Sequence, residues 1–445
     1  MDQSFYFLPN SPTNRRLDRF SILNDDQEGE DGPVPFWALL QHVLQPNIES
    51  SGQLIEVLDT VSNILRDSSG SAGEYGTLKS MVDGHGPAFF VDVWPKIVYC
   101  SLQLQECFPE GRIPVLQPGT KLQWTRLQVA SLVANQFLCS LDCPAGRDGY
   151  FDFSIWYASE QRHPYSAQMY LKAVFEYFRQ LQVPFPDEAA SNPAKVVYSM
   201  HDYHETSPPS PEPERVPLQP ISVQMLESYD TRLQEHSHQE PDGAVVISAN
   251  KDIGFGNSPE ACPAVLVTPT LQATETVTIE GAAPMLCITG QRRNVQWEVL
   301  PRERRIGGRM LFMDALEIDE LDGSEALPDI QPGHLEREIR KAYTAFSSWA
   351  SGDESTVYTG VWGCGAFNGD PGVKMTILWI AASMAGRRLT VVCDDSHGGF
   401  PMQFRGLVDR VPSSWTVREL RTLLESLAPD TQRSETVKEL SRLLE

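Results

Sequence analysis

The segment 358–370, which reads YTGVWGCGAFNGD, constrains the fold of this chain more than any other stretch, because four of its thirteen residues are glycines. Glycines permit positive φ angles and let the backbone approach a ligand closely. The segment lies between an extended stretch at 355–358 and an apolar run at 372–385 that is typical of a buried helix. Asp370 suits a helix N-cap and Pro371 suits a first helical turn. The pattern therefore predicts a strand, a tight loop and a helix, in that order.

Backbone amides of a glycine-rich loop beside a helix start commonly bind an anion such as phosphate or pyrophosphate. Trp362 and Phe367 add flat aromatic surfaces that a nucleotide could contact. The alternative is a plain strand-to-helix turn whose glycines serve packing, since a glycine pattern alone is a weak signal. The candidate binding residues of the loop are Gly363, Cys364, Gly365, Ala366 and Phe367.

Bulk composition limits the classes of function. The 445 residues are enough for two or three domains. The formal net charge of −23 opposes non-specific nucleic-acid binding, so we expect no direct contact with DNA. The eight cysteines form no CxxC pair, which favours reduced thiols over a disulfide framework or a zinc site. The N-terminal stretch lacks the apolar core of a signal peptide, and we expect an intracellular protein without membrane association.

Changes in composition and hydrophobic periodicity along the chain predict its domains. Residues 1–32 are polar and acidic and predict a flexible arm. Residues 33–195 read as a helical domain, in which apolar residues recur at helical spacing, for example over 127–141. Residues 196–242 contain a proline-rich stretch and predict a linker or insertion. Residues 243–445 alternate short apolar strands with helices, which indicates an α/β architecture.

Local patterns predict individual elements. The expected strands are 244–248, 285–289, 310–316 and 389–393. Thr416 with Glu419, and Thr436 with Glu439, resemble capping boxes that open two short helices.

His201, Asp202 and His204 superficially suggest a metal cluster. No further ligands at finger-like spacing accompany them, so we expect an exposed loop and no metal site.

The run WGCGAF at 362–367 closely resembles the diphosphate-binding loop of poly(ADP-ribose) glycohydrolases, where it is a family signature. The stretch 127–139 resembles the long helix of that family's helical accessory domain, and 248–254 resembles the strand end that enters its catalytic loop. The resemblance keeps its order and spacing over roughly 33–430. It implies a macrodomain-like three-layer α/β/α sandwich that binds ADP-ribose, with the helical domain packed in front.

The catalytic pattern of that family is altered. Hydrolysis of a ribose–ribose bond needs a carboxylic acid that protonates the leaving oxygen. The family supplies it with three glycines, a short spacer and Gln-Glu-Glu, whereas this chain reads GFGNSPEACP from Gly254. Gly254 and Gly256 remain as substrate-binding candidates, while Ala261 and Cys262 stand in place of the two glutamates. Glu260 is the candidate catalytic acid, and the alternative is a solvent-facing loop residue.

The resemblance also implies other ligand contacts. Asn250 is kept and would face a ribose hydroxyl. Cys393 stands in place of the family's aromatic adenine platform, for which Phe400 could compensate. Arg292 and Arg293 could offer guanidinium groups to phosphates, or they could form a solvated surface pair.

Three functions remain open. The first is a divergent glycohydrolase that trims poly(ADP-ribose), the second is a non-catalytic ADP-ribose reader, and the third is a scaffold for protein partners. The resemblance implies poly(ADP-ribose) or ADP-ribosylated proteins as partners, a monomer, and a location in the nucleus or cytoplasm in keeping with the DNA damage response. No cofactor and no metal are implied, because a carboxylic acid and water suffice for the reaction.

Overall fold

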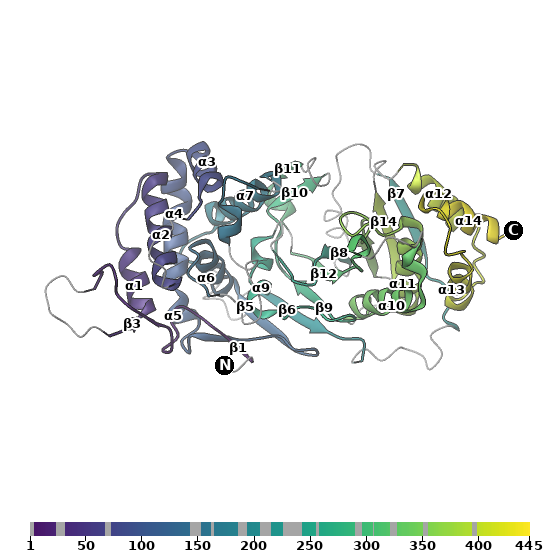
Figure 1. Cartoon of the computed structure of the whole chain (residues 1–445), viewed down its shortest axis with the longest axis horizontal. Helices are drawn as coiled ribbons and strands as arrows, with labels where there is room; N and C mark the ends of the chain where they lie inside the picture. The colour runs from purple at the N-terminus through teal and green to yellow at the C-terminus, as the bar shows by residue number, and fades with distance from the viewer. Residues whose placement is uncertain are drawn as a thin grey trace.

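The computed structural model describes residues 4–23, 32–66, 73–142, 153–161, 164–185, 194–204, 215–225, 243–254, 258–289, 296–305, 307–320, 327–349, 355–393 and 398–445. The molecule is elongated (Figure 1), with the N-terminal helices at one end, a large sheet in the middle and the C-terminal helices at the other end.

The N-terminal helices are α1 (Phe36–Val43), α2 (Ser51–Arg66), α3 (Gly76–His85), α4 (Trp94–Leu102), α5 (Leu104–Cys107), α6 (Arg126–Phe137) and α7 (Pro164–Gln180). The helix predicted from the spacing over 127–141 is confirmed as α6. This helix opens with a capping box, in which Gln128 N donates to Thr125 Oγ1 and Thr125 N donates to Gln128 Oε1. Every residue of α6 from Val129 to Phe137 is buried, so α6 is the central helix of this part of the protein.

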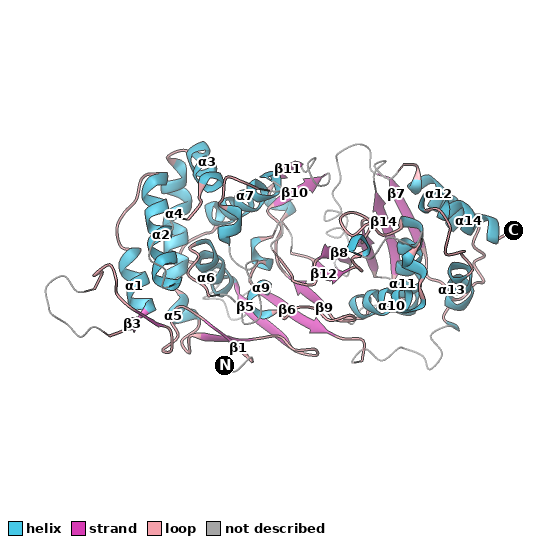
Figure 2. Cartoon of the chain, in the orientation of Figure 1, coloured by secondary structure: helices cyan, strands magenta, loops and turns pink. Residues whose placement is uncertain are grey.

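The central sheet has eight strands in the order β5 (Lys121–Thr125), β6 (Lys195–His201), β9 (Thr276–Glu280), β12 (Arg309–Asp314), β8 (Ala244–Ala249), β13 (Thr356–Thr359), β14 (Arg388–Cys393) and β7 (Ile221–Met225). Strands β12, β8, β13, β14 and β7 run parallel, and β9, β6 and β5 add antiparallel neighbours at one side. Figure 2 shows this sheet crossing the middle of the molecule. The mixed α/β fold and the strands predicted at 244–248, 310–316 and 389–393 are confirmed.

The segment predicted as a linker, 196–242, differs from that expectation because it contributes β6 and β7 to the central sheet. In β6, Val196, Tyr198 and Met200 alternate with more exposed neighbours, which is the period of a half-buried strand. The prolines at 205–220 fall between these two strands in the sequence, and a proline-rich stretch of this kind is typical of a linker. The positions of the domain boundaries stay a prediction.

The N-terminal stretch also differs from the expected flexible arm. In its described part, β1 (Phe5–Phe7) pairs with β4 (Arg112–Pro114), and β2 (Arg15–Arg16) pairs with β3 (Val34–Pro35). Tyr6 and Leu8 are buried, because β1 lies against the core of the helical part.

The strand predicted at 285–289 exists but lies outside the central sheet. It forms β10 (Leu286–Thr289), which pairs antiparallel with β11 (Gln296–Val299) in a separate two-stranded sheet. Figure 1 places this hairpin next to α7. Arg292 and Arg293, between the two strands, lie outside the described residues.

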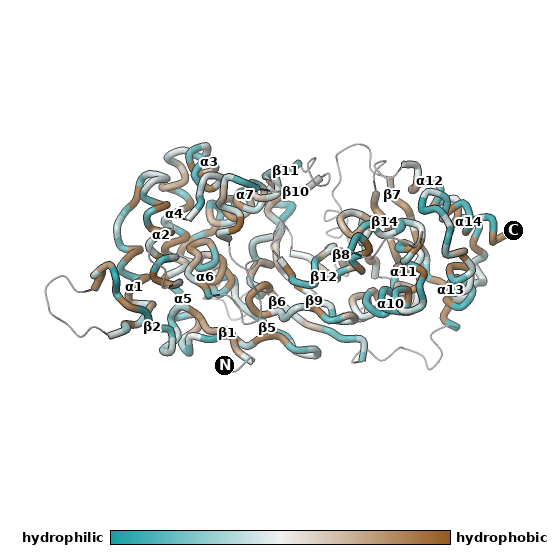
Figure 3. Tube along the Cα trace, in the orientation of Figure 1, coloured by the Kyte–Doolittle hydropathy of each residue, from teal (hydrophilic) through white to brown (hydrophobic). Residues whose placement is uncertain are grey.

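Two helices cover one face of the parallel strands. They are α10 (Pro332–Phe346) and α11 (Pro371–Met384), which is the helix predicted at 372–385. Residues 372–384 of α11 are all buried, as expected for a mostly apolar helix, and they include the charged Lys374. Figure 3 shows that α10 carries many hydrophilic residues, in keeping with a helix that has one face outside the core. No helix within the described ranges is both long and apolar enough to span a bilayer.

The chain ends in α12 (Phe400–Val408), α13 (Val417–Glu425) and α14 (Thr436–Leu443). The capping box predicted at Thr416 and Glu419 is confirmed at the start of α13. The second predicted box is wrong, because α14 begins at Thr436 with Glu435 at the N-cap. The hydroxyl of Thr436 instead donates to Oδ2 of Asp370, 2.9 Å away.

Arg387, in the connection between α11 and β14, joins the end of α10 to the segment that precedes β13. Its guanidinium is buried and donates to Phe346 O at 3.2 Å, Trp349 O at 2.6 Å and Ser355 Oγ at 2.7 Å. We expect Arg387→Met to lower the free energy of unfolding by about 3 kcal/mol, because buried acceptors lose their donor. Urea denaturation measures this loss, and the exposed Arg410→Met is the control. Equal stability of the two variants would contradict this role of Arg387.

Candidate functional site

The carboxyl ends of the parallel strands define the candidate site. From β8 the chain continues toward β9 and β12 on one side of the sheet, whereas from β13 it continues toward β14 on the other side. The strand order therefore reverses between β8 and β13. In open α/β sheets, ligands bind outside the carboxyl ends of the strands at such a switch point. The segments that follow β8, β12 and β13 meet at this edge.

The glycine-rich loop after β13 packs too closely for side chains at two of its glycines. Gly363 has φ +75°, and a Cβ atom placed on it would lie 2.7 Å from the Cβ of Ala315. A Cβ atom on Gly369 would lie 2.5 Å from Cε of Lys374. The amide of Gly369 donates to Gly363 O at 2.9 Å, which closes the loop on itself. These contacts explain the glycines at 363 and 369 by sterics alone.

Trp362 does not offer the ligand surface that the sequence suggested. Its side chain is completely buried, and its indole N–H donates to Met313 O at 3.0 Å. The expectation for Trp362 is therefore wrong, because this ring anchors the loop to the end of β12. Phe367 is half-buried and packs at the margin of the same core.

The start of α11 carries the predicted cap. Oδ1 of Asp370 accepts the amide of Val373 at 2.8 Å, and Pro371 occupies the first turn. The amide of Asp370 in turn donates to the carboxylate of Asp329 at 3.3 Å. Burial raises the pKa of Asp370 to about 6 and also raises the pKa of Asp329. Because carboxylates already occupy the positive end of α11, an anion would bind at the loop amides and not at the helix start.

The turn 363–367 presents backbone donors. Ala366 is exposed and Phe367 is half-buried. Within the described part of the chain, the amides of Ala366 and Phe367 donate to no protein acceptor, whereas those of Cys364 and Asn368 are used inside the loop. Consecutive unpaired amides on a glycine-rich turn are suitable donors for phosphate oxygens.

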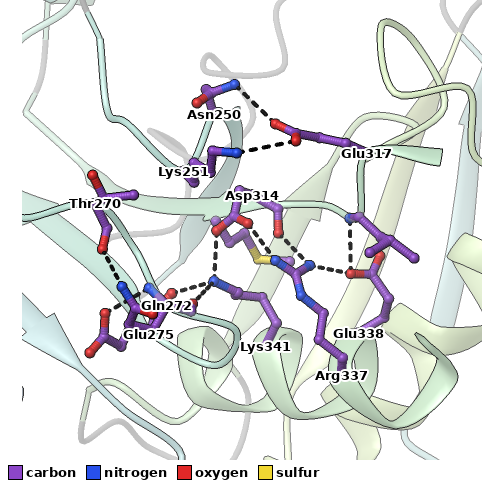
Figure 4. Close-up of polar contacts among 12 residues, drawn as sticks. Asn250, Lys251, Thr270, Gln272, Glu275, Asp314, Glu317, Arg337, Glu338 and Lys341 are labelled. Carbon is purple, nitrogen blue, oxygen red and sulfur yellow. Dashed lines mark hydrogen bonds and ion pairs between the residues drawn. The ribbon is translucent and has the colours of Figure 1, made fainter. Parts of the chain in front are cut away.

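A buried network of charged side chains from α10, α11 and the end of β12 lies next to the glycine-rich loop. Lys374 in α11 is fully buried and pairs with Glu338 of α10, and its Nζ lies 3.5 Å from Oδ1 of Asp329. Glu338 also pairs with Arg337, which in turn pairs with Asp314 at the end of β12 (Figure 4). Burial alone would raise the pKa of Glu338, but the charges of Lys374 and Arg337 hold it below its usual value. The network fixes the end of β12 and the start of α11 relative to α10.

Lys341 extends this network toward β9. Its ammonium group donates to Asp314 Oδ1 at 2.6 Å and to the backbone oxygens of Gln272 and Glu275 at 2.8 and 2.7 Å (Figure 4). Burial lowers the pKa of Lys341 to about 8, against the attraction of Asp314. With all three protons donated, Lys341 has a structural role.

Glu260 lies between the helical part and the sheet. Its side chain is 2% exposed, so the alternative of a solvent-facing residue is wrong. Oε1 pairs with Arg126 at the start of α6, and Oε2 accepts the amide of Ala283 at 2.9 Å. The hydroxyl of Tyr198 donates to the backbone oxygen of Glu260. This carboxylate would have to leave both partners to act as an acid, and its catalytic role stays a prediction.

The candidate residues next to Glu260 in sequence differ in their burial. Ala261 and Cys262 are buried, and the backbone oxygen of Cys262 accepts from Nε2 of Gln136 at 3.3 Å. Gly254 lies in open space, and Gly256 lies outside the described residues.

Asn250 is exposed at the end of β8, where its Oδ1 accepts the amide of Asp252 at 3.0 Å. Its Nδ2 lies 3.4 Å from Oε1 of Glu317, which follows β12. Lys251 lies 3.4 Å from the other oxygen of Glu317. Sequence reasoning missed Glu317, although its place just after the strand predicted at 310–316 was a usable signal.

The proposed adenine platform is not exposed. Cys393 is buried, and the ring of Phe400 is buried against Phe404 with ring centroids 5.3 Å apart. Neither side chain offers a free face to a base, so this expectation is wrong. Among the described residues, no group of three histidine, cysteine or acidic side chains is placed to hold a metal ion.

Comparison with known proteins gives two matches to family models. Residues 225–397 match the model described as poly(ADP-ribose) glycohydrolase, macro domain fold, and residues 83–200 match the model of its helical domain. Poly(ADP-ribose) glycohydrolase 1 of Caenorhabditis elegans is 32% identical over 159 residues, which are 32% of this chain and 20% of that protein. Poly(ADP-ribose) glycohydrolase 2 of the same organism is 28% identical over 156 residues, which are 32% of each chain. The match thus spans only a fifth to a third of these curated relatives.

Solved structures of poly(ADP-ribose) glycohydrolases are also similar. The apo enzyme of Deinococcus radiodurans is 12% identical with a TM-score of 0.33, covering 52% of this chain and 94% of that one. The enzyme of Thermomonospora curvata is 13% identical with a TM-score of 0.28, covering 46% and 82%.

The buried cap of α11 predicts a pH dependence of stability. Because the pKa of Asp370 is raised to about 6, the folded state holds this proton more tightly than the unfolded chain does. The resulting stabilisation is complete below about pH 4 and is lost as the pH rises through about 6. Asp370→Asn keeps a good cap and removes the titration.

We therefore expect the unfolding free energy of the wild type, relative to Asp370→Asn, to fall by about 3 kcal/mol between about pH 4 and pH 7. Urea denaturation at several pH values measures it, with the exposed Asp409→Asn as the control. A difference that stays constant with pH would rule out this titration.

Proposed function

Because this chain belongs to the poly(ADP-ribose) glycohydrolase family, we propose that it binds ADP-ribose at the carboxyl edge of the parallel strands. The diphosphate lies on the backbone of Gly363, Cys364, Gly365, Ala366 and Phe367. The observation that carries the proposal is the pair of amides at Ala366 and Phe367, which have no protein acceptor within the described residues. A chain with a net charge of −23 can bind an anion there because amides, and not a basic surface, supply the donors.

The strand order supports one orientation of the ligand. With the diphosphate over the end of β13, the ends of β8 and β12 lie on one side and those of β14 and β7 on the other. Asn250 follows β8, so the ribose attached to the far end of the diphosphate lies on that side, near Gly254. The adenosine then lies toward β14. We propose poly(ADP-ribose) or an ADP-ribosylated protein as the natural ligand that binds in this orientation.

Substitution within the loop tests this binding. We expect Gly365→Glu to weaken ADP-ribose binding at least tenfold, because a carboxylate would repel the diphosphate and fill the turn. Isothermal titration calorimetry with ADP-ribose measures the affinity. Gly360→Ala is the matched control, since a Cβ atom at 360 meets nothing within 4 Å. Wild-type affinity in the Gly365→Glu variant would refute the assignment of the loop.

Hydrolysis of the ribose–ribose bond is a second candidate function, and Glu260 is the acid that it requires. In support, Glu260 is next to Ala261 and Cys262, where the family carries its glutamates. Against it stands the double attachment of the carboxylate to Arg126 and to the amide of Ala283. We infer that the family's glutamate pair is lost here and that any turnover depends on Glu260. Without turnover, the protein is an ADP-ribose reader.

Two substitutions separate catalysis from structure at Glu260. If Glu260 is the acid, Glu260→Gln lowers release of ADP-ribose from a defined polymer by at least about 100-fold. Arg126→Gln breaks the same ion pair but leaves the carboxylate, so it retains turnover. The measurement is chromatographic detection of released ADP-ribose, with thermal melting of each variant. No release by the wild type, or a parallel loss of turnover and stability in both variants, would exclude Glu260 as the acid.

A further inference from the structure

Glu317 carries a carboxylate at the candidate site that the binding contacts above do not use. It follows β12 and faces Asn250 and Lys251, which follow β8 (Figure 4). Both contacts are 3.4 Å long, whereas strong charge-assisted hydrogen bonds measure about 2.7–2.9 Å. The side chain of Glu317 is 23% exposed. Its oxygens therefore keep the capacity to accept hydrogen bonds from a ligand.

The segment that leads to Glu317 lies directly against the glycine-rich loop. The Cβ of Ala315 is 2.7 Å from the position that a Cβ on Gly363 would occupy. Adjacent strands are about 4.8 Å apart, so the ends of β12 and β13, with β8 between them, are about 10 Å apart. A diphosphate with one ribose attached bridges a separation of about this size.

Side chains of α10 hold the backbone that leads to Glu317 in place. The amide of Leu316 donates to Oε1 of Glu338 at 3.1 Å, and Arg337 donates to Asp314 O at 2.9 Å. Binding groups select well when their supporting contacts fix them in position. The buried network therefore positions the diphosphate loop and Glu317 at the same time.

The charges of Glu317 and Lys251 indicate which part of a ligand can bind next to Glu317. The attraction of Glu317 raises the pKa of Lys251, so the two side chains face each other as a charged pair. An ionised carboxylate only accepts hydrogen bonds, and it repels phosphate. Vicinal hydroxyls of a ribose are donors without charge, and acidic side chains bind ribose hydroxyls in other α/β nucleotide sites.

We propose that Glu317 determines specificity by accepting hydrogen bonds from the hydroxyls of the distal ribose, the ribose attached to the far end of the diphosphate. This inference rests on the proposed function and makes it more specific. The site then selects nucleoside diphosphates that carry a second ribose over ADP itself.

Calorimetric titrations of the full chain with ADP-ribose and with ADP test the inference. We expect the wild type to bind ADP-ribose at least tenfold more tightly than ADP, since hydrogen bonds to charged groups are among the stronger ones. Glu317→Gln should lose about tenfold in affinity for ADP-ribose and nothing for ADP. The control is Glu320→Gln, which removes an exposed carboxylate from the same stretch and should change neither affinity.

Each other outcome overturns the inference in a distinguishable way. If Glu317→Gln keeps the wild-type preference for ADP-ribose, or weakens both ligands equally, Glu317 does not contact the distal ribose, and ADP-ribose binding itself stands. The same conclusion follows if the wild type binds ADP and ADP-ribose equally. If the wild type binds neither ligand, the proposed function fails together with the inference. Thermal melting of each variant excludes misfolding as the cause.

Discussion

The ion pair between Lys374 and Glu338, closed off from water beneath the glycine-rich loop, is the contact on which the candidate site depends. It joins α11 to α10, and through Arg337 and Asp314 it reaches the end of β12. A buried ion pair contributes little net stability, yet loss of one partner costs about 3–5 kcal/mol because the other charge stays buried. Lys374 also limits the loop sterically, because it leaves no room for a side chain at Gly369.

The two parts of the site are held by different means. The glycine-rich loop is positioned by packing, with Trp362 anchored to Met313 and the loop closed on itself. The segment at Glu260 is positioned by both parts: Arg126 at the start of α6 pairs with its carboxylate, and the hydroxyl of Tyr198 in β6 donates to its backbone oxygen. The loop is therefore a property of the α/β part alone, whereas the segment at Glu260 needs both parts. A carboxylate held in this way is well suited to join two parts of a protein.

Much of this arrangement could be predicted from the sequence, where local rules apply. The glycine-rich turn, the cap at Asp370 and the buried helix α11 follow from steric and capping preferences within a few residues. The strand β6 was missed because its alternation of buried and exposed residues is short and precedes a proline-rich stretch. The burial of Trp362 could not be read from its neighbours, since its partner Met313 is distant in sequence.

The same limit applies to charged residues. The sequence offered a catalytic acid or an exposed loop residue as roles for Glu260. Its ion pair with Arg126 could not be predicted, because only the tertiary fold brings these two distant positions together. Lys374 and Glu338 read as ordinary polar positions on two helices until the fold brings them together. Glu317 differs from these, since its place after a parallel strand is a topological clue.

The backbone ladder between β5 and β6 has a consequence for how the chain can be divided. β5 belongs to the stretch that otherwise forms helices, yet it pairs along its whole length with β6, which pairs with β9. A cut at the change from helical to α/β texture would leave unpaired strand edges on both fragments, and such edges invite aggregation. The helical part therefore cannot separate from the α/β part along this boundary unless the main-chain hydrogen bonds between β5 and β6 break.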